Sequence, residues 1–303
     1  MKAIAAALLL APFAAACATG SDSGAPVAVA AAPSFASERI GVTVRGSGPD
    51  VVLIPGLSSS PEVWNSTIEA VPGYRYHVVH VAGFAGKAPG ANASGEVVAP
   101  VAEEIARYIR EAKLERPAIV GHSLGGAWAM MVASRYPDIA SKIMVVDMLP
   151  FMGAMFGGPN ATADSIRPIA EQIRSGIAAS GGEARKGMTD QTIATMVKTE
   201  SLRPAAVAHS MNSDAAVSGQ AMYDLILMDL RPALKGIKVP ISVLWVRAPN
   251  APVTDAQMAQ FYMMSYANAP QAKLTQVPNS YHFIMWDAPE AFQRELKAFL
   301  AAS

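Results

Sequence analysis

The sequence predicts an α/β fold in which helices flank a mostly parallel central sheet. From Glu38 onward, short apolar runs alternate with segments of helical periodicity. Several of these runs are apolar on both faces, as expected for strands that helices cover on both sides. The length of 303 residues allows one large α/β domain or two smaller ones. Strand-helix alternation of this kind indicates a sheet of parallel strands.

Seven segments have the pattern of strands, and two have the pattern of packed helices. The strand candidates are Ile40–Val44, Val51–Ile54, Tyr76–Val81, Ala118–Val120, Ile143–Val146, Ile241–Val246 and Lys273–Val277. Apolar residues recur at three-four spacing from Val98 to Ala112, which predicts an amphipathic helix. The same spacing from Phe292 to Phe299 predicts a closing helix after Pro289, a residue favoured in the first turn.

The alternation is interrupted between Val146 and Ile241 by about 90 residues of mostly helical pattern, too many for a simple crossover. We therefore expect a helical cap (148–235), inserted after the sixth strand, on a core formed by 38–147 and 236–303. The methionines of this segment suit an adaptable apolar surface. We expect an apolar stripe and further helices over Met148, Leu149, Met152, Met155 and Phe156, over Ile166–Ile177 and over Ile193–Val197.

The main functional motif is Gly121-His122-Ser123-Leu124-Gly125, which fits the G-x-S-x-G pattern of a nucleophile elbow. It follows the strand that ends at Val120 and precedes a helix-like run. A serine on so sharp a turn adopts a strained backbone conformation and exposes its hydroxyl. The flanking glycines are needed because a Cβ there would collide with the neighbouring strand or helix. The motif therefore predicts that Ser123 is a nucleophile.

With this motif in this order of elements, the chain resembles the α/β-hydrolase family, in particular its capped, esterase-like members, from about residue 38 to 301. That family orders nucleophile, acid and histidine along the chain. The resemblance places the histidine at His282, between the last strand and the closing helix. A serine hydroxyl needs such a base because it is almost never ionised near pH 7. We interpret the other four histidines as structural: His77, His80, His122 and His209.

The third member of the triad, a buried carboxylate, departs from the common family pattern. Most relatives carry it in the loop after the strand Ile241–Val246, where this chain has Asn250. An amide cannot stabilise an imidazolium as a charge does. Asp147 ends the strand Ile143–Val146, and some family branches, including certain haloalkane dehalogenases, take their acid from this strand end. Asp255 lies a few residues beyond the position where most relatives carry the acid, and it fits better as a helix cap. We favour Asp147, with Asp255 and Asn250 as alternatives.

The oxyanion hole is expected to consist of backbone N–H groups. Leu124 follows the nucleophile at a helix start, where unpaired donors point outward. The resemblance places the second donor at Leu57, in the loop after Val51–Ile54. The side chains expected to bind substrate are Met148, Phe151 and Trp128.

These residues predict a carboxylesterase-like serine hydrolase that cleaves a small-molecule ester through an acyl-enzyme, with no metal or other cofactor. Amide or peptide cleavage in the same site is an alternative, but it would need charged groups in the cap to hold a substrate amine. A second alternative is a surface binding protein that kept the fold and lost turnover, which Asn250 suggests. Ser123 excludes a dehalogenase, which needs a carboxylate there. The apolar cap favours an apolar acyl or alcohol group.

Composition excludes other classes of protein. The 24 basic residues balance 24 acidic ones, charged residues make up 16%, and no basic run is present. We therefore expect no nucleic-acid partner. A single cysteine excludes an internal disulfide and a Cys-based zinc site. The glycine-rich segment 121–126 lacks the Gly-Lys-Ser/Thr ending of a phosphate-binding loop.

The first residues predict an export signal, with Lys2 followed by an apolar run too short to span a bilayer. Ala14-Ala15-Ala16-Cys17 resembles a bacterial lipoprotein box, in which the cysteine becomes the acylated first residue. That box usually has leucine where Ala14 stands, and ordinary cleavage within the alanine run is the alternative. Ala, Gly, Ser, Pro and Val dominate the next segment. We expect a signal peptide (1–17), a flexible linker (18–37) and an exported, periplasmic protein with a lipid anchor at Cys17.

Overall fold

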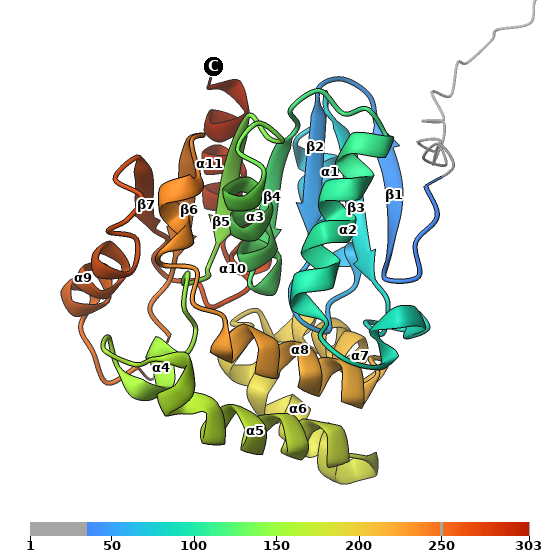
Figure 1. The fold of residues 1–303 in the computed structure, drawn as a ribbon, viewed down its shortest axis with the longest axis vertical. Helices are drawn as coiled ribbons and strands as arrows, with labels where there is room; N and C mark the ends of the chain where they lie inside the picture. Colours follow the sequence, from blue (N-terminus) through green and yellow to red (C-terminus); the bar gives the residue numbers. More distant parts are fainter. Residues whose placement is uncertain (1–34, 249–250, 303) are drawn as a thin grey trace, which may run out of the picture.

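The computed structural model describes residues 35–248 and 251–302, and in them a seven-stranded sheet lies between two layers of helices (Figure 1). The strand order is β1-β3-β2-β4-β5-β6-β7. β1 pairs with β3 antiparallel, and all other neighbours are parallel. This confirms the predicted α/β fold. The strands are β1 (Ile40–Gly46), β2 (Asp50–Ile54), β3 (Arg75–Val81), β4 (Ala118–His122), β5 (Lys142–Val146), β6 (Ile241–Trp245) and β7 (Ala272–Gln276).

All seven predicted segments form strands, and their ends differ from the prediction by one or two residues. The difference matters at β4, which continues past the predicted end at Val120. Its last residue, His122, pairs with Val146, the last residue of β5. An apolar pattern cannot show where ladder pairing stops, so strand ends are its weakest feature. As a result, the next residue of each strand, Ser123 and Asp147, emerges at the same edge of the sheet.

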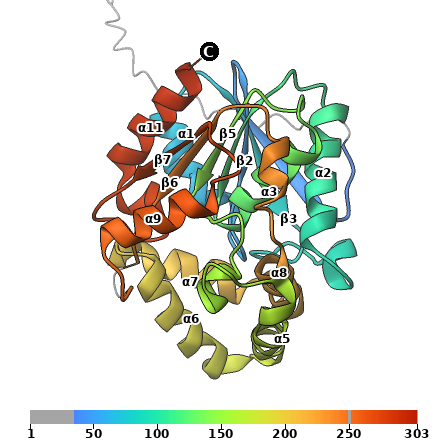
Figure 2. The same cartoon turned by 60° about the vertical axis from the view of Figure 1, so that its left-hand side comes forward.

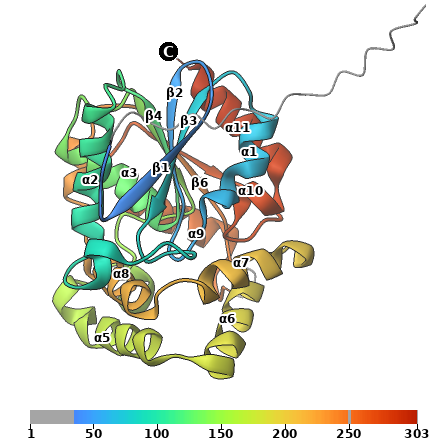
Figure 3. The same cartoon turned by 90° about the vertical axis from the view of Figure 1, so that its right-hand side faces the viewer.

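Helices cover both faces of the sheet because strand side chains alternate between them. Val52 and Ile54 pack into the core under α2 and α3, whereas Val51 and Leu53 pack with α1, α10 and α11. Figure 3 shows α2 and α3 on one side of the sheet and α1, α10 and α11 on the other. The core helices are α1 (Asn65–Ala70), α2 (Val98–Glu111), α3 (Leu124–Arg135), α9 (Asp255–Ser265), α10 (Ile284–Asp287) and α11 (Pro289–Ala301), with 3-10 turns η1 (Pro61–Trp64), η2 (Gly90–Ala93) and η4 (Ala233–Gly236).

Between β5 and β6 the chain forms a layer of helices over the ends of the strands. α5 packs against α8, and α6 packs against α7, so that the layer has two arms (Figure 2). It follows the fifth strand of the described sheet, one strand earlier than the predicted place after the sixth. Its elements are α4 (Ala154–Gly157), α5 (Ala163–Ala179), α6 (Gly182–Met196), η3 (Glu200–Leu202), α7 (Arg203–Met211) and α8 (Ala215–Leu227).

Two expectations for the cap need correction. The apolar stripe from Met148 to Phe156 does not form one helix, because only Ala154–Gly157 is helical. Pro150 lies inside the stripe and has no N–H to donate to a helical hydrogen bond. The helix predicted at Ile193–Val197 is only the last turn of α6, whose other residues are mostly exposed and so show little apolar periodicity.

Residues 1–34 lie outside the described residues, so the signal peptide (1–17), the lipid site at Cys17 and most of the linker (18–37) stay predictions. The last linker residues, however, are packed rather than free. The ring of Phe35 lies 5.1 Å from that of Tyr108 and 4.4 Å from the Arg107 guanidinium, which also donates to the Ala36 carbonyl at 2.8 Å. Among the residues that the structure describes, no helix combines the length and apolarity needed to span a membrane.

Candidate active site

Ser123 lies on the turn between β4 and α3, and its backbone has a φ of 53° and a ψ of −125°. Residues other than glycine rarely adopt this conformation. A turn this sharp leaves no room for neighbouring side chains. A Cβ on Gly121 would lie 2.0 Å from the Gly125 carbonyl oxygen, and one on Gly125 would lie 2.1 Å from that of Ile54. The Ser123 N–H donates to the Val146 carbonyl at 2.9 Å, which ties the turn to β5. The local geometry is that of a nucleophile elbow.

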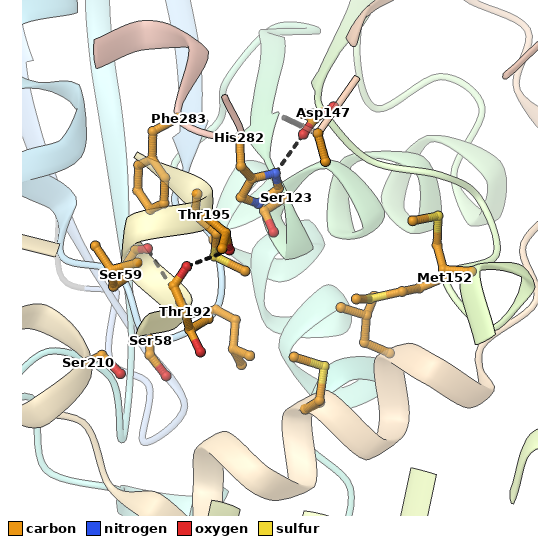
Figure 4. A pocket seen from close by; sticks show the side chains of 18 of the residues that line it. Ser58, Ser59, Ser123, Asp147, Met152, Thr192, Thr195, Ser210, His282 and Phe283 are labelled. Carbon is orange, nitrogen blue, oxygen red and sulfur yellow. Dashed lines mark hydrogen bonds and ion pairs between the residues drawn. The ribbon is translucent and has the colours of Figure 1, made fainter. Parts of the chain in front are cut away.

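Asp147 and His282 are far apart in the sequence and meet at the end of the sheet. Asp147 follows β5, and His282 lies between β7 and α10. His282 Nδ1 and Asp147 Oδ2 are 2.6 Å apart (Figure 4). Because a carboxylate accepts, Nδ1 carries the proton of this hydrogen bond, and Nε2 of the neutral ring is left as an acceptor.

The side chains of Ser123 and His282 lie next to each other in Figure 4, and both residues line the same cavity. Chemically, this arrangement allows the ring to accept the hydroxyl proton while Asp147 stabilises the resulting imidazolium. The structure thus brings the three predicted triad residues together at the ends of β4, β5 and β7.

The alternative acids do not occupy this position. Asp255 is the exposed first residue of α9, and its Oδ1 accepts from Arg247 Nε at 2.5 Å. This hydrogen bond lowers the pKa of Asp255. Asp255 is not the helix cap either, because Thr254 is the N-cap residue of α9. Asn250 lies outside the described residues. Among the described carboxylates, Asp147 is the one that binds the His282 ring.

Two further hydrogen bonds hold Asp147. Its Oδ1 accepts from the Val246 N–H at 3.1 Å and from the Tyr262 hydroxyl at 3.1 Å. Tyr262 is buried on α9, stacked on Trp245 with ring centroids 5.1 Å apart. Burial, and then the nearby charge of Asp147, raise the pKa of Tyr262, so its hydroxyl keeps its proton and donates. Sequence reasoning missed Tyr262 because it belongs to no motif and resembles any other core aromatic residue.

The expected oxyanion-hole residues lie beside the serine. Leu124 is the first residue of α3, and the loop that carries Leu57 packs directly on the elbow. A Cβ on Gly56 would lie 2.9 Å from Ser123 Cβ and 3.2 Å from His122 Nδ1, so this close approach requires glycine. Neither the Leu57 nor the Leu124 N–H has an acceptor within the described parts of the chain. Leu57 lines the cavity, and the role of both N–H groups as an oxyanion hole stays a prediction.

His122 packs against the histidine loop. It is 1% exposed, its ring centroid lies 4.6 Å from that of His282, and its Nε2–H donates to the His282 carbonyl at 3.0 Å. Burial, and then the proximity of His282, hold the pKa of His122 well below its usual range, so the ring is neutral. His77, His80 and His209 lie outside the cavity lining. His122 does line the cavity, so its interpretation as structural stays a prediction.

A cavity of about 920 Å³ lies between the core and the cap, with Ser123 and His282 in its wall. Of the three expected substrate-binding residues, Met148 lines it, whereas Phe151 and Trp128 lie in the packed interior. Trp128 is fully buried, and its Nε1–H donates to the Val98 carbonyl at 2.9 Å. Large aromatic residues in apolar patterns are more often core than lining, which explains both errors. The methionines of the lining are Met148, Met152, Met155, Met188, Met196, Met222 and Met258.

Part of the lining is polar, and sequence reasoning did not identify it. In Figure 4, hydroxyl side chains gather on one side of Ser123 and His282, and Met152 lies on the other. Isolated serines and threonines on helices carry no motif, so only the folded structure shows that they share a wall. This polar wall consists of Ser58, Ser59, Ser180, Arg185, Thr189, Thr192, Thr195, Ser210 and Ser218.

The chain belongs to the alpha/beta hydrolase family, whose sequence model matches residues 51–295. Over 265 residues it is 28% identical to the pimeloyl-[acyl-carrier protein] methyl ester esterase of Vibrio atlanticus, covering 84% of this chain and 96% of that protein. It is 25% identical over 271 residues to the sn-1-specific diacylglycerol lipase ABHD11 of Mus musculus, covering 84% and 81%.

Solved structures share the fold at low sequence identity. An esterase from Exiguobacterium antarcticum matches with a TM-score of 0.69 and 21% identity, over 86% of this chain and 97% of that one. The enol-lactonase from Burkholderia xenovorans LB400 matches with a TM-score of 0.67 and 16% identity, over the same shares.

Proposed function

We propose that the protein is a serine hydrolase that cleaves carboxylic esters through an acyl-enzyme. The observation that carries this proposal is the hydrogen bond between Asp147 and His282 beside the strained elbow of Ser123. The relatives support it, since those named above are an esterase of methyl esters and a lipase.

In the proposed reaction, Ser123 Oγ attacks the ester carbonyl carbon while His282 Nε2 takes the hydroxyl proton. The carbonyl oxygen becomes an oxyanion that accepts from the Leu57 and Leu124 N–H groups, each such donor being worth about 3–4 kcal/mol. Asp147 stabilises the imidazolium. The imidazolium then returns its proton to the leaving alkoxide, and an alcohol departs. Water, deprotonated by His282, attacks the acyl-enzyme, releasing the acid and restoring the serine.

Labelling with a fluorophosphonate tests the nucleophile. We expect the probe to modify Ser123, and Ser123→Ala to lose both labelling and turnover of p-nitrophenyl esters. Ser134→Ala, a partly exposed serine at the other end of α3, is the matched control and keeps both. Turnover that persists in Ser123→Ala would remove the proposed triad.

The two alternative functions have less support. Amide cleavage of an amine-bearing substrate needs a free carboxylate in the cavity, and the carboxylate in the described lining, Asp147, is already bound to His282. The non-catalytic interpretation rested on Asn250, and Asp147 provides a carboxylate for the same role. Parallel assays with a p-nitrophenyl ester and an aminoacyl p-nitroanilide separate esterase from amidase, and the absence of probe labelling would favour the binding protein.

We also propose that the protein is exported to the periplasm and acylated at Cys17. The proposal is supported by the charged start, the short apolar run and the lone cysteine of the first 17 residues.

A further inference from the structure

The cavity wall contains an arginine that the proposed reaction does not use. Arg185, on α6, is the one permanently cationic side chain among the described residues of the lining. The one carboxyl group of this lining, that of Asp147, is bound to His282 at 2.6 Å. Arg185 has no carboxylate within 4.0 Å in the described parts of the chain, unlike Lys186 beside it, whose Nζ pairs with Asp190 at 2.7 Å.

The guanidinium of Arg185 is fixed but only partly bonded. Its Nη2 donates to the carbonyls of Ser210 and Ser213, both at 2.7 Å, at the turn between α7 and α8. Of the five N–H groups of an arginine, those on Nε and Nη1 remain, and none has an acceptor within residues 35–248 and 251–302. A held cation with spare donors is preorganised for charge-assisted hydrogen bonds to an anion.

Hydroxyl side chains line the cavity on the same helix as Arg185. Thr189 and Thr192 lie one and two turns further along α6 and also line the cavity. Ser58 Oγ and Ser218 Oγ, whose residues also line the cavity, share a hydrogen bond of 2.8 Å. Met188 and Met196 of the same helix also line the cavity, and Met152 lies on the other side of Ser123 and His282 from the labelled threonines (Figure 4). The lining contributed by α6 therefore combines one cation and hydroxyl groups with apolar side chains.

We propose that Arg185 binds an anionic oxygen group of the substrate. The preferred ester then carries a carboxylate or a phosphate in its acyl part or in its alcohol part. This inference rests on the proposed ester hydrolysis, and it makes Arg185 a specificity-determining residue of that site.

Matched ester pairs test the inference. One pair compares the p-nitrophenyl ester of a long monocarboxylic acid with the p-nitrophenyl hemiester of the dicarboxylic acid of equal length. The second pair compares an ester whose alcohol part carries a terminal carboxylate with the same ester lacking it. A third substrate carries a terminal phosphate in place of the carboxylate, which separates the two sources of charge. We expect the wild type to show a higher kcat/KM for the anionic member of at least one pair. The preference should weaken as salt rises.

The variants separate charge recognition from damage to the cap. Arg185→Gln should lower kcat/KM for the anionic ester by about tenfold or more and leave the neutral ester within about twofold. Lys186→Gln removes a cation from the same helix but outside the lining, and should change neither. Since Arg185→Gln also loses bonds to Ser210 and Ser213, Arg185→Lys, which keeps the charge, should retain part of the preference.

The outcomes distinguish this inference from the proposed function. Equal kcat/KM for charged and neutral esters in the wild type, or a preference that survives in Arg185→Gln, would overturn the role of Arg185 while ester hydrolysis stands. If no ester is turned over, the proposed function fails instead. Calorimetric binding then still tests Arg185: a dicarboxylate should bind more tightly than the monocarboxylate of equal length in the wild type, and not in Arg185→Gln.

Discussion

At the residue scale, both oxygens of Asp147 accept hydrogen bonds, one from the His282 ring and the other from the Val246 N–H and the Tyr262 hydroxyl. These bonds set the direction of the carboxylate, and through it the tautomer of His282. An asparagine would preserve the shape but lose the charge and favour the wrong tautomer. The catalytic contribution of this position should therefore depend on charge rather than on packing.

Asp147→Asn should lower kcat for a p-nitrophenyl ester by about 10⁴-fold, because the imidazolium loses its counter-charge. Asp255→Asn, which removes an exposed carboxylate near the same end of the sheet, should stay within about twofold. Steady-state kinetics of the two variants at one pH make the comparison. A loss below tenfold in Asp147→Asn would show that another group supplies the acid.

The sequence predicts some of these residues and not others for a physical reason. Ser123 is framed by a local motif, and Asp147 and His282 occupy strand ends whose order along the chain the family resemblance supplies. Tyr262 and Arg185 reach the site from helices, through packing that no local pattern encodes. Phe151 and Trp128 were expected in the site because a buried aromatic residue and a cavity-lining one look alike in sequence.

At the scale of elements, α9 connects β6 to the carboxylate of Asp147. Tyr262 stacks on Trp245 of β6, and Tyr266, one turn later, stacks on Tyr262 at 6.4 Å and donates to the Met148 carbonyl at 2.7 Å. The helix therefore presents two buried hydroxyls to the segment after β5. Only the first of them reaches Asp147.

Tyr262→Phe tests α9 as a positioning element. It should lower kcat by roughly 10-fold with little change in KM, since a hydrogen bond to a charged group is lost. The acid limb of the pH profile of kcat/KM should move to higher pH, because a less solvated carboxylate binds the imidazolium more strongly. Tyr266→Phe also removes a buried hydroxyl and should leave this limb in place. Identical profiles for both variants would mean that Tyr262 acts on stability alone.

The more completely a strand or helix is buried, the more clearly its sequence pattern predicted it. β2 and β4 are buried on both faces, and their continuous apolar runs identify them. α2 shows its buried stripe clearly, from Val98 to Ile109. α6 does not, because it buries only Ile193 and turns a mixed polar face toward the cavity. The segment lining a substrate cavity is thus the one that apolar periodicity describes least well.

At the scale of the whole molecule, acylation of Cys17 decides where the proposed activity occurs. In a bacterial host fed a clickable fatty acid, the wild type should incorporate the label and enter the detergent phase. Cys17→Ser should lose both, because the chain has no other cysteine. Ser21→Ala, just past the box, should behave as the wild type. A wild type without label would favour ordinary cleavage in the alanine run.

The packing of Phe35 sets the point at which the segment before it meets the folded core. α2 starts beside the cap, where the Val97 and Val98 N–H groups donate to Asp224 of α8, and runs away from it. Phe35 meets this helix at Tyr108, about ten residues further on, or roughly 15 Å from the cap end. A lipid anchor at Cys17 would therefore be joined to the core of the protein at a point on α2 away from the cap, rather than to the cap helices that line the cavity.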